Sequence, residues 1–150
     1  MKTGHLSGWP VFLIALLNTD KRTIFNLPKT SAMSKRILII EDDPDILEMM
    51  TYILQDEGYR VTASVDCGPL DEIASVKPDL ILMDNRLGGS SGAEACKKLK
   101  TEAATAHIPV ILVSANMHLQ DLTRESLADG YMAKPFDMEE LVAVVSHHLV

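Results

Sequence analysis

The hydrophobic pattern of residues 34–150 alternates between short, continuous apolar runs and longer stretches with helical spacing. A continuous run such as 36–40 (RILII) is typical of a strand that is covered on both faces of a parallel sheet. After Asp43 and Pro44, which suit an N-cap and a first helical position, apolar residues recur three and four apart until Gly58. On this basis the predicted strands are 36–40, 59–64, 80–83, 110–115 and 130–133, and the predicted helices are 44–57, 69–76, 93–100, 117–128 and 137–149.

Strand and helix alternate five times in this pattern, which predicts an α/β fold with a five-stranded parallel sheet. Between the third strand and the third helix, the sequence NRLGGSSG predicts a glycine-rich loop.

The first 32 residues do not follow this alternation. Their one apolar run, WPVFLIALL, resembles the core of a signal peptide but is too short to span a bilayer, and no small-x-small cleavage site follows it. Met33 begins the stretch MSKRILIIEDD, which reads like a natural protein start. We therefore predict that residues 1–33 are an N-terminal extension, disordered or outside the native start, and that 34–150 form the domain.

Charge divides the chain at the same place. Residues 1–32 carry four Lys or Arg and one Asp, a charge of +3, whereas 33–150 carry ten basic and twenty acidic residues, a charge of -10. So acidic a domain lacks the footprint of a protein that binds phosphate backbones, which argues against direct contact with nucleic acid. Two cysteines without a CxxC pair fit neither a disulfide framework nor a zinc site, and we expect a cytoplasmic protein without membrane insertion.

Candidate chemistry lies where the predicted strands end. Parallel sheets bind ligands beyond the carboxyl ends of their strands, and these ends carry Glu41 and Asp42, Asp84, Ser114 and Lys134. Three clustered carboxylates repel one another unless a cation is present, and an all-oxygen site suits Mg²⁺, with Mn²⁺ as a substitute.

A metal beside a carboxylate and a lysine is also what phosphoryl transfer requires. Asp84 would then accept a phosphoryl group as an acyl phosphate, with Lys134 and the metal on two of its oxygens and Ser114 on a third. Each residue has a simpler interpretation too: helix-start acids, an N-cap, a turn hydroxyl and a solvated lysine. Their occurrence together, at the ends of four strands, favours the site.

Four motifs, ILIIEDD, LILMDNRLGGSSG, VILVSA and YMAKPF, resemble the receiver domain of bacterial two-component response regulators over essentially all of 34–150. The resemblance implies a flavodoxin-like, CheY-like fold: a doubly wound sheet with helices on both faces and strand order 2-1-3-4-5. It implies Asp84 as the phospho-acceptor and Glu41 and Asp42 as the acidic pair. Mg²⁺ would be held in this acidic site by Asp42, Asp84 and the backbone carbonyl of Arg86.

The same resemblance implies a switch. Lys134 would contact the phosphoryl group and precede a cis peptide bond to Pro135. Ser114 would move toward the phosphoryl group while Tyr131 turns inward, which would shift a two-state equilibrium at the face of the fourth helix, fifth strand and fifth helix. The simpler interpretation of Tyr131 is an ordinary half-buried strand residue.

Three departures from the family are visible. Gly88 and Gly89 stand where a proline usually occurs four residues after the acceptor, so this loop is expected to be more mobile. Arg86 and Asn116, each two residues after a site residue, are expected to tune the lifetime of the acyl phosphate. The interval from the switch hydroxyl to the lysine is two residues shorter than is common, which affects the end of the helix over 117–128.

The expected function is a single-domain response regulator that takes its phosphoryl group from a histidine kinase or phosphotransfer protein and passes the signal to a protein target. Ile46 and Leu47 are candidates for the kinase contact. Such a protein catalyses only its own phosphorylation and dephosphorylation. Two alternatives are an interaction module that works without phosphorylation and a Mg²⁺-dependent aspartyl phosphatase; the first usually lacks an acid or the lysine, and the second usually has its nucleophile on the first strand.

Overall fold

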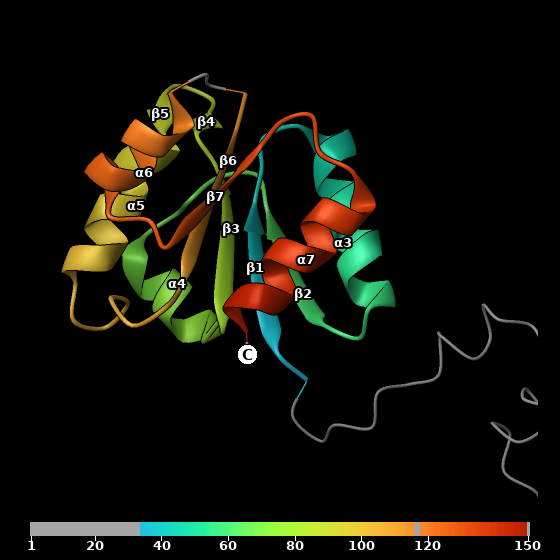
Figure 1. Cartoon of the computed structure of the whole chain (residues 1–150). Coiled ribbons are helices and arrows are strands. Elements are labelled where there is room, and N and C mark those ends of the chain that lie inside the picture. The colour runs from blue at the N-terminus through green and yellow to red at the C-terminus, as the bar shows by residue number, and fades with distance from the viewer. Residues whose placement is uncertain (1–33, 116–117, 150) are drawn as a thin grey trace, which may run out of the picture. The chain divides into compact units, whose positions relative to one another are not determined.

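The computed structural model describes residues 34–115 and 118–149 (Figure 1). The extension predicted over 1–33 and the tuning residue Asn116 lie outside the described residues. The strands are β1 (Arg36–Ile40), β2 (Arg60–Ser64), β3 (Leu80–Asp84), β4 (Arg86–Leu87), β5 (Ser90–Ser91), β6 (Val110–Ser114) and β7 (Gly130–Ala133). The helices are α3 (Pro44–Asp56), α4 (Leu70–Val76), α5 (Gly92–Thr101), α6 (Leu119–Ser126) and α7 (Met138–His148).

The main sheet has five parallel strands in the order β2-β1-β3-β6-β7. Counting only these strands along the chain, the order is 2-1-3-4-5, which confirms the predicted fold class. In Figure 1, α3 and α7 cover one face of the sheet, and α4, α5 and α6 cover the other. Because the order reverses beside β1, the carboxyl ends of β1 and β3 border a crevice, which is where ligands bind in such sheets.

Each face of the sheet has its own core because side chains alternate across a strand. Within β1, Leu38 and Ile40 pack toward α5, whereas Ile37 and Ile39 pack toward α3 and α7. All five residues of β3 are buried, as the continuous apolar run LILM predicts for a central strand.

The start of α3 is fixed by Asp43, which the sequence predicts as its N-cap. Its Oδ1 accepts hydrogen bonds from the backbone N–H groups of Asp45 and Ile46, at 2.9 and 3.2 Å, and Pro44 follows at the first helical position. The site loop that ends β1 is therefore short and held in place.

The glycine-rich segment after β3 forms a short hairpin, where the sequence predicts a loop. β4 and β5 form a two-residue antiparallel ladder, and Gly88 turns between them at a φ of 65°. The prediction of a loop missed this hairpin because two residues are too few to give a periodic signal. Its predicted greater mobility stays a prediction.

The end of α6, where the predicted effect of the short interval before β7 falls, is closed by a leucine. Leu127 closes the helix in the left-handed conformation at a φ of 65°, and the N–H of Ala128 bonds to the carbonyl of Thr123. A glycine usually takes this place, so Leu127 is held in a strained conformation just before β7 begins at Gly130.

At the amino ends of the strands, Asp129 joins three elements. Its Oδ2 accepts hydrogen bonds from Lys100 Nζ on α5, at 2.9 Å, and from the N–H of Val110 on β6, at 2.8 Å, just before β7 begins. Lys100 Nζ also donates to the carbonyl of Ile108, at 3.0 Å. Over the described part of the chain, no helix is both long and apolar enough to cross a membrane.

Candidate functional site

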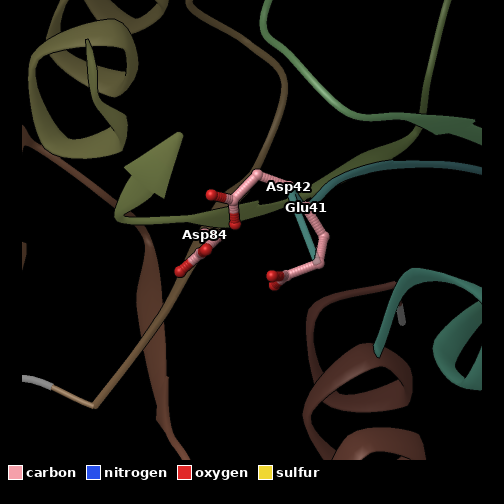
Figure 2. A group of neighbouring side chains, drawn as sticks. All are labelled: Glu41, Asp42 and Asp84. Carbon is pink, nitrogen blue, oxygen red and sulfur yellow. The ribbon is translucent and has the colours of Figure 1, made fainter. Parts of the chain in front are cut away.

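The carboxyl ends of β1, β3, β6 and β7 meet around one cavity of about 410 Å³. It is lined by Glu41, Asp42, Asp43, Ile46, Asp84, Asn85, Arg86, Ser114, Ala115 and Lys134. Figure 2 shows three of its carboxylates, from Glu41, Asp42 and Asp84, facing a common space. One oxygen from each lies within 4.8 Å of the other two, so the residues predicted from separate strand ends are brought together.

Glu41 is the most deeply buried acid of the group, at 1% exposure. Its Oε2 and Oε1 accept hydrogen bonds from Lys134 Nζ at 2.9 and 3.2 Å, and Oε1 also accepts the N–H of Asp43 at 3.2 Å. Burial raises the pKa of Glu41, although the bonds from Lys134 oppose the rise. Glu41 thus anchors the lysine.

Asp84 ends β3 and is 6% exposed. Burial raises the pKa of its carboxyl group above the ordinary value, against the opposing attraction of Lys134, whose Nζ lies 3.4 Å from Oδ1. Burial therefore makes the ionised carboxylate less favourable than it is in water. A bound cation would offset that cost, which is typical of a carboxylate at a functional site.

Lys134 is the cation of the cluster. Burial alone would lower the pKa of its ammonium, but Glu41 and Asp84 outweigh that effect and raise it, so the group is charged near neutral pH. The backbone N–H of Lys134 donates to the backbone carbonyl of Ser114 at 3.0 Å, which ties the end of β7 to the end of β6. The peptide bond to Pro135 is cis, the isomer that the resemblance implies.

Asp42 differs from the other two acids because its side chain is exposed. Its Oδ2 accepts a hydrogen bond from the backbone N–H of Gly88, at 3.3 Å, in the turn of the β4–β5 hairpin. Burial would raise the pKa of Asp42, but hydrogen bonding with the Gly88 N–H and with the Asp84 and Glu41 side chains outweighs that effect, and the pKa is lowered.

Two residues that sequence reasoning missed hold the loop around Asp84. The carbonyl of Asn85 accepts the N–H of Gly92 at 2.8 Å, and its Oδ1 accepts the N–H of Ala93 at 3.1 Å. A Cβ on Gly92 would lie 2.1 Å from the backbone oxygen of Asp84, so only glycine fits there. A glycine at the first position of a helix, behind the N-cap Ser91, is the signal that could have identified this close approach.

The remaining predicted residues surround the acids. Ser114 is buried at the end of β6, on the wall of the cavity, and the side chain of Arg86 is exposed at its rim. Tyr131 is 41% exposed, and its hydroxyl accepts a hydrogen bond from Gln120 Nε2 at 2.9 Å. Its ring therefore lies at the surface, and Gln120 is a further contact that the sequence did not indicate.

The donor set fits a hard divalent cation. Three carboxylates face one ammonium, so these four side chains together carry two net negative charges when all of them are ionised. Carboxylate oxygens beside a cavity that admits water are the ligands that Mg²⁺ prefers, since this ion keeps several of its waters.

A second hollow of about 350 Å³ adjoins this cavity and is almost entirely apolar. Ile46 and Met49 line it from α3, and Pro135 and Phe136 line it from the segment after Lys134. An apolar surface beside a charged site is suited to a partner that must approach that site.

Comparisons with known proteins agree with this geometry. The sequence profile of the response regulator receiver domain matches residues 37–146. The chain is 40% identical over 114 residues to the phosphate regulon transcriptional regulatory protein PhoB of Klebsiella pneumoniae. This match covers 74% of this chain and 50% of that protein. It is 37% identical over 121 residues to the DNA-binding response regulator MtrA of Mycolicibacterium smegmatis, covering 78% of this chain and 51% of that protein.

Among solved structures, a CheY-like response regulator receiver domain protein from Methanospirillum hungatei superposes with a TM-score of 0.71 at 28% identity, covering 78% of this chain and 94% of that chain. The chain thus spans about half the length of the curated relatives it matches and nearly all of this solved relative.

Proposed function

We propose, from the premise that this chain belongs to the response regulator receiver domain family, that Asp84 accepts a phosphoryl group from a phosphohistidine donor. The observation that carries the proposal is the surroundings of Asp84: a buried carboxylate on a cavity wall, 3.4 Å from the Lys134 ammonium and beside two further acids. An interaction module that works without phosphorylation, the alternative function, would not require this arrangement of acids and lysine.

In the proposed transfer, a carboxylate oxygen of Asp84 attacks phosphorus in line with the P–N bond of the donor. The P–N bond breaks as the P–O bond forms, and the imidazole nitrogen keeps the electron pair and takes up a proton. Lys134 offsets negative charge on the phosphoryl oxygens, and Ser114 hydrogen-bonds one of them.

We propose Mg²⁺ as the cation of the site. Asp42, Asp84 and the backbone carbonyl of Arg86 would hold it, and its charge would offset that of the phosphoryl oxygens. Glu41 belongs to the same acidic site, and its two contacts with Lys134 suit it to keep the lysine aligned. Release of product would be hydrolysis of the acyl phosphate, so the protein would catalyse only its own phosphorylation and dephosphorylation.

Two surfaces suit the two partners that this function requires. The apolar hollow lined by Ile46, Met49 and Phe136 adjoins the acidic cavity, which favours it as the contact for a histidine kinase or phosphotransfer protein. The output surface would be α6, β7 and α7, where the hydroxyl of Tyr131 is held at the surface by Gln120. Inward rotation of Tyr131 would break that bond and alter the surface that a protein target meets.

We also propose that the receiver works as a single-domain regulator. This proposal is supported by the solved protein from Methanospirillum hungatei, of which this chain covers 94%. The PhoB and MtrA relatives, in contrast, are about twice as long as the region that matches this chain. The intact mass of the protein isolated from its native source tests this part, and a species with a second domain would contradict it.

Incubation with acetyl phosphate and Mg²⁺, followed by intact-mass measurement, tests the central step. The unmodified chain is expected to gain the mass of one phosphoryl group, labile in base, whereas Asp84→Asn gains none. Asp43→Asn is the matched control: it removes a neighbouring acid of the cavity but leaves a good N-cap, and it should still be phosphorylated. Equal phosphorylation of Asp84→Asn would refute the proposal.

Lys134→Ala separates acceptance of the phosphoryl group from the switch. We expect this variant to be phosphorylated by acetyl phosphate, more slowly because one source of charge compensation is lost. Phosphorylation should no longer change its affinity for the protein target, measured by calorimetry. A target affinity that responds as in the unmodified chain would exclude Lys134 from the switch.

A further inference from the structure

Gly88 lies four residues after Asp84, and its backbone N–H donates a hydrogen bond to Asp42 Oδ2 at 3.3 Å. Proline has no N–H group and could not make the bond that Gly88 makes to Asp42. We propose that the Gly88 amide is a positioning group for metal binding, which holds the Asp42 carboxylate in the orientation that the cation requires. This inference rests on the proposed function, because it takes the acidic site to bind Mg²⁺.

The amide is presented by a hairpin that is closed from both ends. β4 and β5 pair through Arg86 with Ser91 and Leu87 with Ser90, and the carbonyl of Asn85 accepts the N–H of Gly92 at the base. Gly88 turns the chain at a φ of 65°, a conformation that glycine adopts without strain and that proline cannot adopt. The direction of the Gly88 N–H is thus set by the hairpin.

The bond engages Oδ2 of Asp42 within the acidic cluster. Oδ2 accepts the Gly88 N–H at 3.3 Å, while a carboxylate oxygen of Asp42 lies within 4.8 Å of oxygens of both Glu41 and Asp84 (Figure 2). Asp42 is the exposed member of the group, whereas Glu41 and Asp84 are held by burial and by Lys134. The exposed acid is therefore the one that most needs a partner to fix its rotamer.

Fixing this rotamer before the cation binds removes an ordering cost from the binding step. Outer partners that orient metal ligands typically change metal affinity by about 10- to 100-fold when they are lost. Because a single neutral N–H is involved, we expect the lower end of that range.

The experiment compares Gly88→Ala, which keeps the N–H, with Gly88→Pro, which removes it. Both substitutions strain the turn, proline more than alanine because its ring cannot adopt a φ of 65°, so the comparison is repeated without the Asp42 carboxylate to separate the amide from the strain. The Mg²⁺ dissociation constant of the full chain is measured by calorimetry. We expect Gly88→Ala to bind within about 3-fold of the unmodified chain and Gly88→Pro about 10-fold more weakly than Gly88→Ala. Equal affinities of the two variants would overturn the proposal.

The same pair in an Asp42→Ala background shows whether the amide acts through Asp42. Once the carboxylate is absent, the two Gly88 variants should bind Mg²⁺ equally, although weakly. A gap between them that persists in this background would assign the effect to the hairpin in general and overturn the positioning role.

Amide hydrogen exchange of Gly88 in the unmodified chain needs no substitution. The exchange rate is expected to fall when Mg²⁺ is added, since the bound cation would hold Asp42 against the N–H; a rise would mean that the metal takes Asp42 away from Gly88. A chain that binds no Mg²⁺ at all would refute the metal part of the proposed function, whereas tight binding without a difference between the Gly88 variants would refute only the inference drawn from Gly88.

Discussion

Two lysine–carboxylate pairs with the same 2.9 Å separation lie at opposite ends of the sheet. At the amino ends of the strands, Lys100 pairs with Asp129, and the Oδ2 of that carboxylate also accepts the Val110 N–H. At the carboxyl ends, Lys134 pairs with Glu41 and lies near Asp84, with Asp42 close by. The first group has one acid for one lysine, and the second has three.

This difference separates an ion pair that serves the fold from one that serves a ligand. The amino-end group is balanced in charge and joins α5, β6 and the start of β7. The carboxyl-end group keeps two uncompensated negative charges, and burial has raised the pKa of two of its acids, Glu41 and Asp84. Asp129 at the first end should therefore stabilise the protein, whereas the ionised forms of Glu41 and Asp84 at the second end should destabilise it until a cation binds.

Two glycines give the largest expected contrast between the ends. Gly92→Ala forces a Cβ to within 2.1 Å of the Asp84 backbone oxygen, and we expect a loss of about 3 kcal/mol or more in the free energy of unfolding. At the amino end, a Cβ on Gly130 meets the His148 ring at 2.9 Å and the end of the Ile111 side chain at 3.0 Å, which can both move. Gly130→Ala should cost about 1 kcal/mol. Urea unfolding measures both, and equal losses would contradict the contrast.

Asp129→Ala tests the balanced pair. Its removal leaves Lys100 and the Val110 N–H without this acceptor, and we expect unfolding to require about 2 kcal/mol less. Asp121→Ala is the control, because Asp121 pairs with Arg124 on α6 with both side chains largely exposed and should change stability by less than about 0.5 kcal/mol. Mg²⁺ affinity should be unchanged in both variants; a large change in Asp129→Ala would mean that the two ends are not independent.

Asp84→Asn should raise the stability of the protein, and its effect should be the smallest of these. The folded-state pKa of Asp84 is raised, so the ionised carboxylate lowers stability at pH values above that pKa. Without Mg²⁺ at pH 7, the variant should melt a few degrees higher than the unmodified chain, and the gap should close as the pH falls below the ordinary Asp pKa. Added Mg²⁺ should reverse the order, because only the unmodified site binds it well. A variant that melts lower at pH 7 without Mg²⁺ would contradict this view of the carboxyl end.

The fold could be predicted from sequence because its signals are local and repeated. Each apolar run that became a strand, such as 36–40 and 80–83, is bounded by polar or turn residues, and Asp43 with Pro44 marks the start of a helix. The meeting of Glu41, Asp42 and Asp84 also followed, because parallel strands end at one edge of the sheet.

The contacts that sequence reasoning missed are long-range bonds made by ordinary groups. The N–H of Gly88 reaches Asp42 across 46 residues, and Lys100 reaches Asp129 across 29. Every residue except proline has a backbone N–H, so the sequence does not show which of these groups binds a distant side chain. Lys and Asp are common surface residues, so their types alone do not reveal that Lys100 and Asp129 pair. The glycine run indicated a flexible loop by composition, whereas the positive φ of Gly88 serves the turn of a hairpin.

The bond between Lys134 and Glu41 joins residues 93 positions apart, one at the end of β1 and the other just beyond β7. The site is therefore complete only when the last strand of the sheet has paired, and a partly folded chain that lacks β7 has no lysine in the acidic cavity. A ligand of this site then recognises the finished sheet alone, so it should slow unfolding and leave the rate of folding nearly unchanged. Occupancy of the site therefore reports that the edge strand β7 has paired.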